Sequence, residues 1–122
     1  MFKNSFEKTT EEIFQERAEV LHRTGEALTD ALHKLTSIEN DVNRIIEDLN
    51  TCTGHEEPNT LRTLYARVNK EISRYNRARE HAKLRYHYLI ITREAMGIRR
   101  HTWVDEVYRI PPRKKPVGTA RE

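Results

Sequence analysis

Glycine, proline and cysteine are scarce in this chain, whose 122 residues include four glycines, four prolines and one cysteine. A many-stranded β protein needs more turn residues than this, and a phosphate-binding loop needs several glycines close together. The single Cys52 excludes an internal disulfide and a cysteine-based zinc cluster, because both need a second thiol. The composition therefore favours an all-α protein without cofactors.

Long apolar runs are also missing, since no stretch approaches the roughly 18 apolar residues that a membrane span requires. Residues 1–5 lead into charged sequence, whereas a signal peptide would continue into an apolar stretch. We therefore expect a cytoplasmic protein that has no contact with membranes. The length suits a single domain, and with 34% charged residues its core must be thin.

What the chain does have is a seven-residue apolar period in its first half. The period is carried by Phe14, Leu21, Leu28, Leu35, Val42 and Leu49. A second apolar series, from Leu61 to Met96, advances by alternating steps of four and three residues. Both patterns are typical of coiled-coil helices. They predict two long helices that pack against each other.

The ends of these helices are marked by capping and helix-breaking residues. Thr9 and Glu12 match a capping box, Gly54 and Pro58 interrupt the pattern, and Gly97 is placed to end the second helix. The sequence thus predicts a coiled-coil-like antiparallel helical hairpin over residues 1–97. It consists of a helix over 9–50, a loop over 51–59 and a helix over 60–96.

Charge is divided between the two halves, which supports the hairpin independently. Residues 1–57 carry six Lys/Arg and thirteen Asp/Glu, a net charge of −7, whereas residues 58–122 carry sixteen and six, a net charge of +10. An antiparallel register in which position n faces 110 − n would place Arg79 beside Asp30 and Tyr86 over Gly25. Glycine weakens a helix, and we interpret Gly25 as the residue that makes room for the Tyr86 ring.

The apolar arc of the first helix is wider than one partner helix can cover. Its additional apolar residues predict self-association into a dimer with a four-helix arrangement. The residues predicted to mediate it are Ile13, Val20, Ile38 and Ile45.

Residues 98–122 form a basic C-terminal segment that contains the only tryptophan. We expect a short helix or an extended tail here, ordered to about residue 110 and flexible beyond, with Trp103 either docked on its own hairpin or bound to a protein partner. The expected dock is an apolar strip of the second helix at Leu84, Tyr88 and Ile91. The predicted partner-binding residues are Arg99, Arg100, Trp103, Val107, Tyr108, Arg113, Lys114 and Lys115.

Two constellations invite a chemical interpretation. Glu19-x-x-His22 matches half of a di-iron bundle motif and Asp30-x-x-His33 repeats it, but on a helical wheel these residues point away from the seam. Cys52 lies three residues from His55 in the loop, where neither a third orienting group nor an oxyanion site is evident. We therefore expect no metal site and no enzyme.

The sequence thus predicts a non-catalytic structural or adaptor protein that mediates protein–protein association with a partner of unknown identity. The alternative is a nucleic-acid-associated protein that binds phosphates weakly through its basic second helix and tail. A metal-binding helical bundle is a third interpretation.

Overall fold

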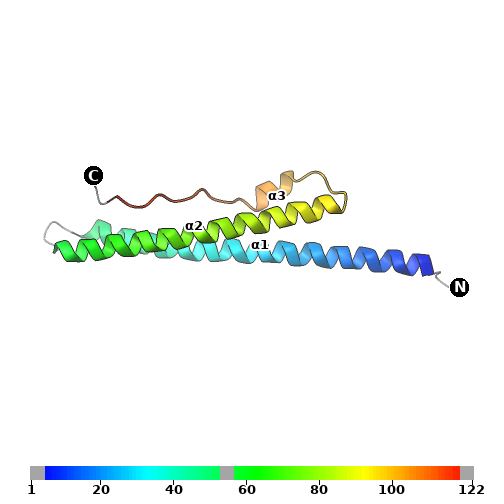
Figure 1. Ribbon diagram of the computed structural model, residues 1–122, viewed down its shortest axis with the longest axis horizontal. Coiled ribbons are helices and arrows are strands. Elements are labelled where there is room, and N and C mark those ends of the chain that lie inside the picture. Colours follow the sequence, from blue (N-terminus) through cyan, green and yellow to red (C-terminus); the bar gives the residue numbers. More distant parts are fainter. Residues whose placement is uncertain (1–4, 53–56, 119–122) are drawn as a thin grey trace.

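A computed structural model describes residues 5–52 and 57–118, which form two long helices, a short helix and an extended tail (Figure 1). Helix α1 spans Ser5–Thr51, α2 spans Pro58–Ala95 and α3 spans Thr102–Val107. The predicted all-α fold and the antiparallel pairing of α1 with α2 are confirmed. The loop residues 53–56, including His55 and Gly54, lie outside the described part of the chain.

Pro58 and Gly97 account for two of the helix ends, although α2 begins two residues before its predicted start at residue 60. Pro58 is the first residue of α2, where its missing N–H needs no partner. Gly97 adopts a φ of 86°, and the N–H groups of Gly97 and Ile98 donate to the carbonyls of Glu94 and Arg93, a Schellman closure. The predicted start at Thr9 is wrong, because its hydroxyl donates to the Ser5 carbonyl from inside the helix.

The core is the seam between α1 and α2, with a spacing of three and four residues on both helices. In α1 the buried residues are Leu28, Ala31, Leu35, Ile38, Val42 and Ile45. They face buried residues of α2, namely Val68, Ile72, Tyr75, Ala82, Leu89 and Arg93. This alternation is the coiled-coil pattern expected from the sequence.

Ile38 and Ile45 are therefore not available for self-association, and the prediction for these two residues is wrong. Both pack in the intramolecular core with Ile72 and Val68. The wide apolar arc of α1 is divided between two neighbours within the chain. Helix α2 covers the side with Ile38, whereas the C-terminal segment approaches the side with Leu32, which lines a pocket together with Pro111.

After Gly97 the chain turns back, and residues 98–118 return along the hairpin toward the α1–α2 connection (Figure 1). Val104 of α3 is completely buried against Leu28 and Leu89, and Val117 near the end of the tail packs on the main core cluster. The C-terminal segment is thus a third layer over one groove of the hairpin. The expectation that the segment is flexible beyond about residue 110 is wrong, because Lys114 and Val117 both dock on the hairpin.

Candidate interaction surfaces

The α2 patch, formed by Leu84, Tyr88 and Ile91, is an apolar strip that nothing in the described chain covers. These side chains are between 45% and 60% exposed. The predicted docking of the C-terminal segment here is wrong, because Val104 packs on Leu28 and Leu89 in the groove on another face of the hairpin. Leu89, which lies between Tyr88 and Ile91 in sequence, is buried in the groove that the C-terminal segment covers.

An open groove beside the α2 patch is bounded by both long helices, and we call it the α2 groove. It is lined by Arg23, Thr24, Ala27, Arg85, Tyr88, Ile91 and Thr92. The guanidinium of Arg85 lies 5.9 Å from the centre of the Tyr88 ring, a cation–π distance. The described lining residues include two arginines and no carboxylate, so this groove combines an apolar floor with positive charge at its edge.

A second exposed apolar surface lies on residues 5–19 of α1, which we call the overhang. This part of α1 extends past the end of α2 (Figure 1). Phe6 is 78% exposed and Phe14 is 62% exposed, and Ile13 is also exposed. Of the residues predicted to mediate self-association, only Ile13 belongs to this surface, while Val20 is half-buried.

Helix α3 is fastened to α2 by polar contacts at both of its ends. At its start, the buried Arg93 donates to the Arg100 carbonyl at 2.7 Å and to His101 Nδ1 at 3.2 Å. Because Nδ1 accepts, His101 carries its hydrogen on Nε2, which lies 3.3 Å from Glu94 Oε2. Further along, Tyr86 donates its hydroxyl hydrogen to the Asp105 carboxylate. That hydrogen bond, together with burial, raises the pKa of Tyr86.

Trp103 is half-exposed, so it is neither fully docked on its own hairpin nor fully free to bind a partner. One face of its ring meets the Arg93 guanidinium at 5.1 Å, and Tyr108 lies 6.4 Å away between ring centres. Val107, also predicted to bind a partner, is more exposed than Trp103. Tyr108 instead returns to α1, where its hydroxyl is 3.7 Å from the Cβ position of Gly25. The ring over Gly25 is thus Tyr108, and the prediction of Tyr86 at this place is wrong.

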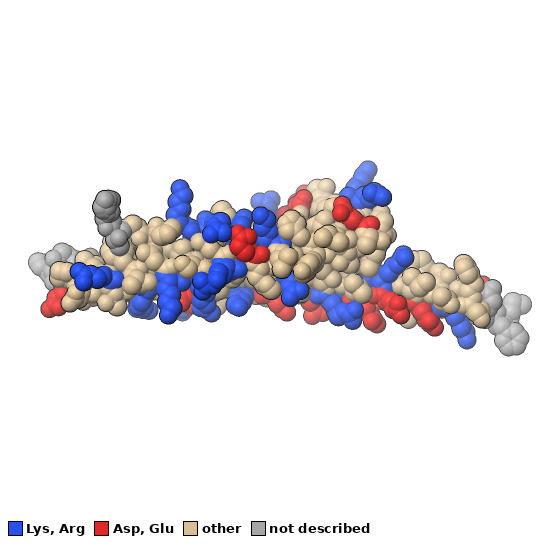
Figure 2. All heavy atoms as spheres, in the orientation of Figure 1, with Lys and Arg blue, Asp and Glu red and all other residues tan. Residues whose placement is uncertain are grey.

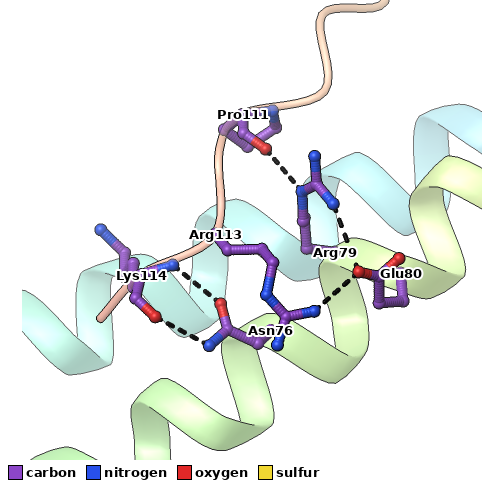
Figure 3. A network of polar contacts seen from close by, with 6 residues as sticks. All are labelled: Asn76, Arg79, Glu80, Pro111, Arg113 and Lys114. Carbon is purple, nitrogen blue, oxygen red and sulfur yellow. Dashed lines mark hydrogen bonds and ion pairs between the residues drawn. The ribbon is translucent and has the colours of Figure 1, made fainter. Parts of the chain in front are cut away.

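The tail is held by two asparagines of α2 that bind its main chain (Figure 3). Asn76 donates to the Lys114 carbonyl at 2.9 Å and accepts from the Lys114 N–H at 2.8 Å. Asn69 makes the same pair of bonds to Val117, at 3.3 and 2.7 Å. The sequence reasoning missed both residues, although their spacing of seven places them at one position of the heptad, next to the buried seam.

Basic residues of the tail already have acidic partners on the hairpin. Arg113 donates to Glu80 at 2.8 Å, which lowers the pKa of that carboxyl, and the Lys114 ammonium lies 3.0 Å from Glu39 and 4.8 Å from the Tyr75 ring centre. Arg79 donates to the Pro111 carbonyl and to Glu80 (Figure 3), so the predicted pairing with Asp30 gives way to contacts with the tail. Among the predicted partner-binding residues, Arg99, Arg100 and Lys115 are exposed.

Positive charge is spread widely over the face seen in Figure 2, where Lys and Arg side chains follow the hairpin from its connecting end to α3. One groove between α1 and α2 collects several cationic or titratable side chains, namely Lys34, Arg74, Arg77 and His81. Arg74 is partly neutralised, since it lies 3.3 Å from Glu71 and 3.8 Å from Asp41. The groove is therefore basic without being lined by cations alone.

The described residues contain no group of three or more His, Cys, Asp or Glu side chains that could bind a metal ion together. His22 pairs with Glu26 one turn further along the exposed face of α1. Cys52 is half-buried at the end of α1, and its predicted neighbour His55 lies outside the described residues.

No helix in the described chain is both long and apolar enough to cross a membrane. The apolar surfaces of α2 and of the overhang are the candidate functional sites, together with the basic groove. Comparisons with protein-family models, with curated proteins and with solved structures find no match for this chain.

Proposed function

We propose that this chain is a non-catalytic structural or adaptor protein whose α2 patch mediates protein–protein association. Self-association is part of this proposal, with two hairpins forming a four-helix dimer. The observation that carries it is the exposure of Leu84, Tyr88 and Ile91 side by side on an otherwise charged helix.

Physical chemistry supports this assignment. Monomeric soluble proteins scatter single apolar residues over their surfaces but rarely group large ones together with an aromatic ring. Tyrosine and arginine are enriched where proteins bind one another, and Arg85 lies over Tyr88 at this place. The open shape of the α2 groove suits a helix or another broad surface better than a small molecule, which binds in deep pockets.

Oligomeric state tests the proposal directly. Light scattering of the purified chain at micromolar concentration should give at least twice the monomer mass of 14.5 kDa. The double variant Leu84→Ser/Ile91→Ser should lower the mass to that of a monomer, because it removes the apolar contact without touching the core. Ala66→Ser is the control, since it changes an exposed apolar residue of α2 that lies outside the patch. Equal masses for all three proteins would contradict the proposal.

The basic groove supports a second candidate function, weak binding of nucleic-acid phosphates. Lys34, Arg77 and His81 line this groove, and Arg99, Arg100 and Lys115 add exposed positive charge on the C-terminal segment. Such binding would lose affinity steeply between low and physiological salt. Titration of random-sequence DNA at two salt concentrations, with Lys34→Glu/Arg77→Glu as the variant, tests it. Binding that is unchanged in the variant would exclude the groove.

A further inference from the structure

We propose that the overhang of a second copy of this chain occupies the α2 groove, and that two copies exchange this contact reciprocally. This inference rests on the proposed function, because it names the partner of the α2 patch. It commits to residues 5–19 as the occupant for three reasons: matching length, opposite charge and compatible symmetry.

The two apolar strips match in length and shape. Phe6, Ile13 and Phe14 lie at positions i, i+7 and i+8, within about 100° on one side of α1. From Phe6 to Phe14 the helix rises about 12 Å, and from Leu84 to Ile91 it rises about 10.5 Å. The overhang can therefore lie along the α2 patch with both strips covered over their full length.

The occupant cannot be the overhang of the same copy. Helix α1 is continuous from Ser5 to Thr51, so its first turns point away from the groove that its own later turns help to form. Helix α3 and the tail are also committed, because Val104 and Val117 are packed against other parts of the hairpin. Coverage of the α2 groove thus has to come from another chain.

Charge favours this pairing over contact between two overhangs. Residues 5–19 contain five glutamates against Lys8 and Arg17, a net charge of −3. Two overhangs packed on each other would bring like charges together, whereas the α2 groove offers Arg23 and Arg85. Glu16 lies about 60° from Ile13 around the helix, on one flank of the apolar strip, where it can approach these arginines.

A two-fold axis allows both contacts to form at once. The overhang and the α2 groove are neighbours along the long axis of the hairpin, near the end of α2 (Figure 1). Turning a second hairpin end for end about an axis at this place lays each overhang beside the groove of the other copy. Isologous contacts of this kind close after two subunits, and formation of one contact raises the effective concentration for the other.

The first test removes the apolar side of the contact. Phe6→Ser/Phe14→Ser should weaken dimerisation by at least about 10-fold in sedimentation velocity, as expected when two aromatic anchors of an interface are lost. Circular dichroism should remain helical, because both side chains are exposed on the overhang. Ala66→Ser again serves as the control and should leave the dimer intact.

The second test exchanges the charges. Glu16→Arg and Arg23→Glu/Arg85→Glu should each dimerise poorly alone, while an equimolar mixture should form a heterodimer that native mass spectrometry resolves. In that heterodimer each overhang meets a groove of opposite charge. Persisting homodimers, or a mixture that stays monomeric, would overturn the inference.

The outcomes separate this inference from the proposed function. If Leu84→Ser/Ile91→Ser yields monomers but Phe6→Ser/Phe14→Ser does not, the α2 patch mediates association and the overhang is not its occupant. If neither double variant changes the mass of a dimeric wild type, both proposals fail. A wild-type chain that stays monomeric also overturns both.

Discussion

Asn69 and Asn76 show how a largely polar segment can be held through its main chain, with Val117 as an apolar anchor near its end. Each carboxamide uses one N–H donor and its oxygen acceptor to pair with the C=O and N–H of a single tail residue, as Figure 3 shows for Asn76. Because these bonds involve main-chain atoms, they place few demands on the tail sequence. Lys114 adds the specific contact, since its ammonium meets both Glu39 and the Tyr75 ring.

Asn76→Ala should release the tail locally at Lys114. Both hydrogen bonds disappear together, at a cost of about 1–3 kcal/mol in the free energy of unfolding. Amide exchange of Lys114 should accelerate, since its N–H loses the Asn76 acceptor. In Asn69→Ala, the matched control, exchange should accelerate at Val117 instead. If each variant accelerated exchange equally at both residues, the two contacts would not be independent clamps.

Gly25 has a different neighbour from the one predicted, because Tyr108 and not Tyr86 lies beside it. A Cβ at this position would lie 3.7 Å from the Tyr108 hydroxyl, an ordinary van der Waals distance. Alanine therefore fits without displacing the ring, and alanine is favoured over glycine inside a helix by about 1 kcal/mol. Gly25→Ala should raise the free energy of urea unfolding by about 0.5–1 kcal/mol. A loss of stability would mean that Tyr108 packs closer to α1 than this distance indicates.

At the scale of elements, the periodic parts of the chain were predictable from sequence and the tail was not. The heptad spacing of Leu28, Leu35 and Val42 predicts α1 through a local rule, and the glycine after Met96 predicts the end of α2. The assignment of Ile38 and Ile45 to a self-associating side of α1 was wrong, since both are buried in the seam with α2. The rotation of α1 depends on where the C-terminal segment docks, which is a tertiary contact that helix periodicity does not encode.

The docking of the tail on the hairpin was not predicted because its contacts with α2 are mainly polar. Pro111-Pro-Arg-Lys-Lys-Pro116 has no apolar pattern, and its anchors on the hairpin are asparagines, an arginine and carboxylates. Such residues read as a solvated helix face in a sequence, since their partners lie more than 30 positions away. The α2 patch, by contrast, was visible as an apolar strip, although what covers it was assigned incorrectly.

Docking of α3 on α2 should weaken in alkaline solution. Tyr86 donates to Asp105, and its pKa is raised above the usual 10.0, first by this hydrogen bond and then by burial. A raised pKa in the folded state means that the stabilisation is complete below pH 10 and is lost as the pH rises through the folded value. Tyr75, whose pKa burial also raises, contributes in the same direction.

The pH dependence of urea unfolding between pH 8 and 11 measures this effect. Wild type should lose stability at the upper end of the range more steeply than Tyr86→Phe, which has no hydroxyl to ionise. Tyr88→Phe, a change at an exposed ring of the same helix, should retain the wild-type slope. Identical slopes for wild type and Tyr86→Phe would show that the hydrogen bond to Asp105 contributes no pH dependence.

At the scale of the whole molecule, the hairpin is unevenly covered along its length. The end near the α1–α2 connection has two helices and a tail, the middle has two helices and α3, and the overhang has one helix alone (Figure 1). An isolated helix of about 15 residues is marginal in water, because its first turn is costly to form and nothing packs against it. The overhang thus has the least local stability in the chain, unless another chain covers it.

This unevenness makes the exchange of overhang amides a sensitive report on assembly. If a second copy covers residues 5–19, hydrogen exchange there should slow as protein concentration rises through the dimerisation range, because packing adds to the opening free energy. The segment 60–75 packs on α1 within the same chain, so its amides should exchange at rates that do not change with protein concentration. In Phe6→Ser/Phe14→Ser the overhang should exchange fast at every concentration. Overhang exchange in the wild type that is fast and independent of concentration would show that these turns remain uncovered.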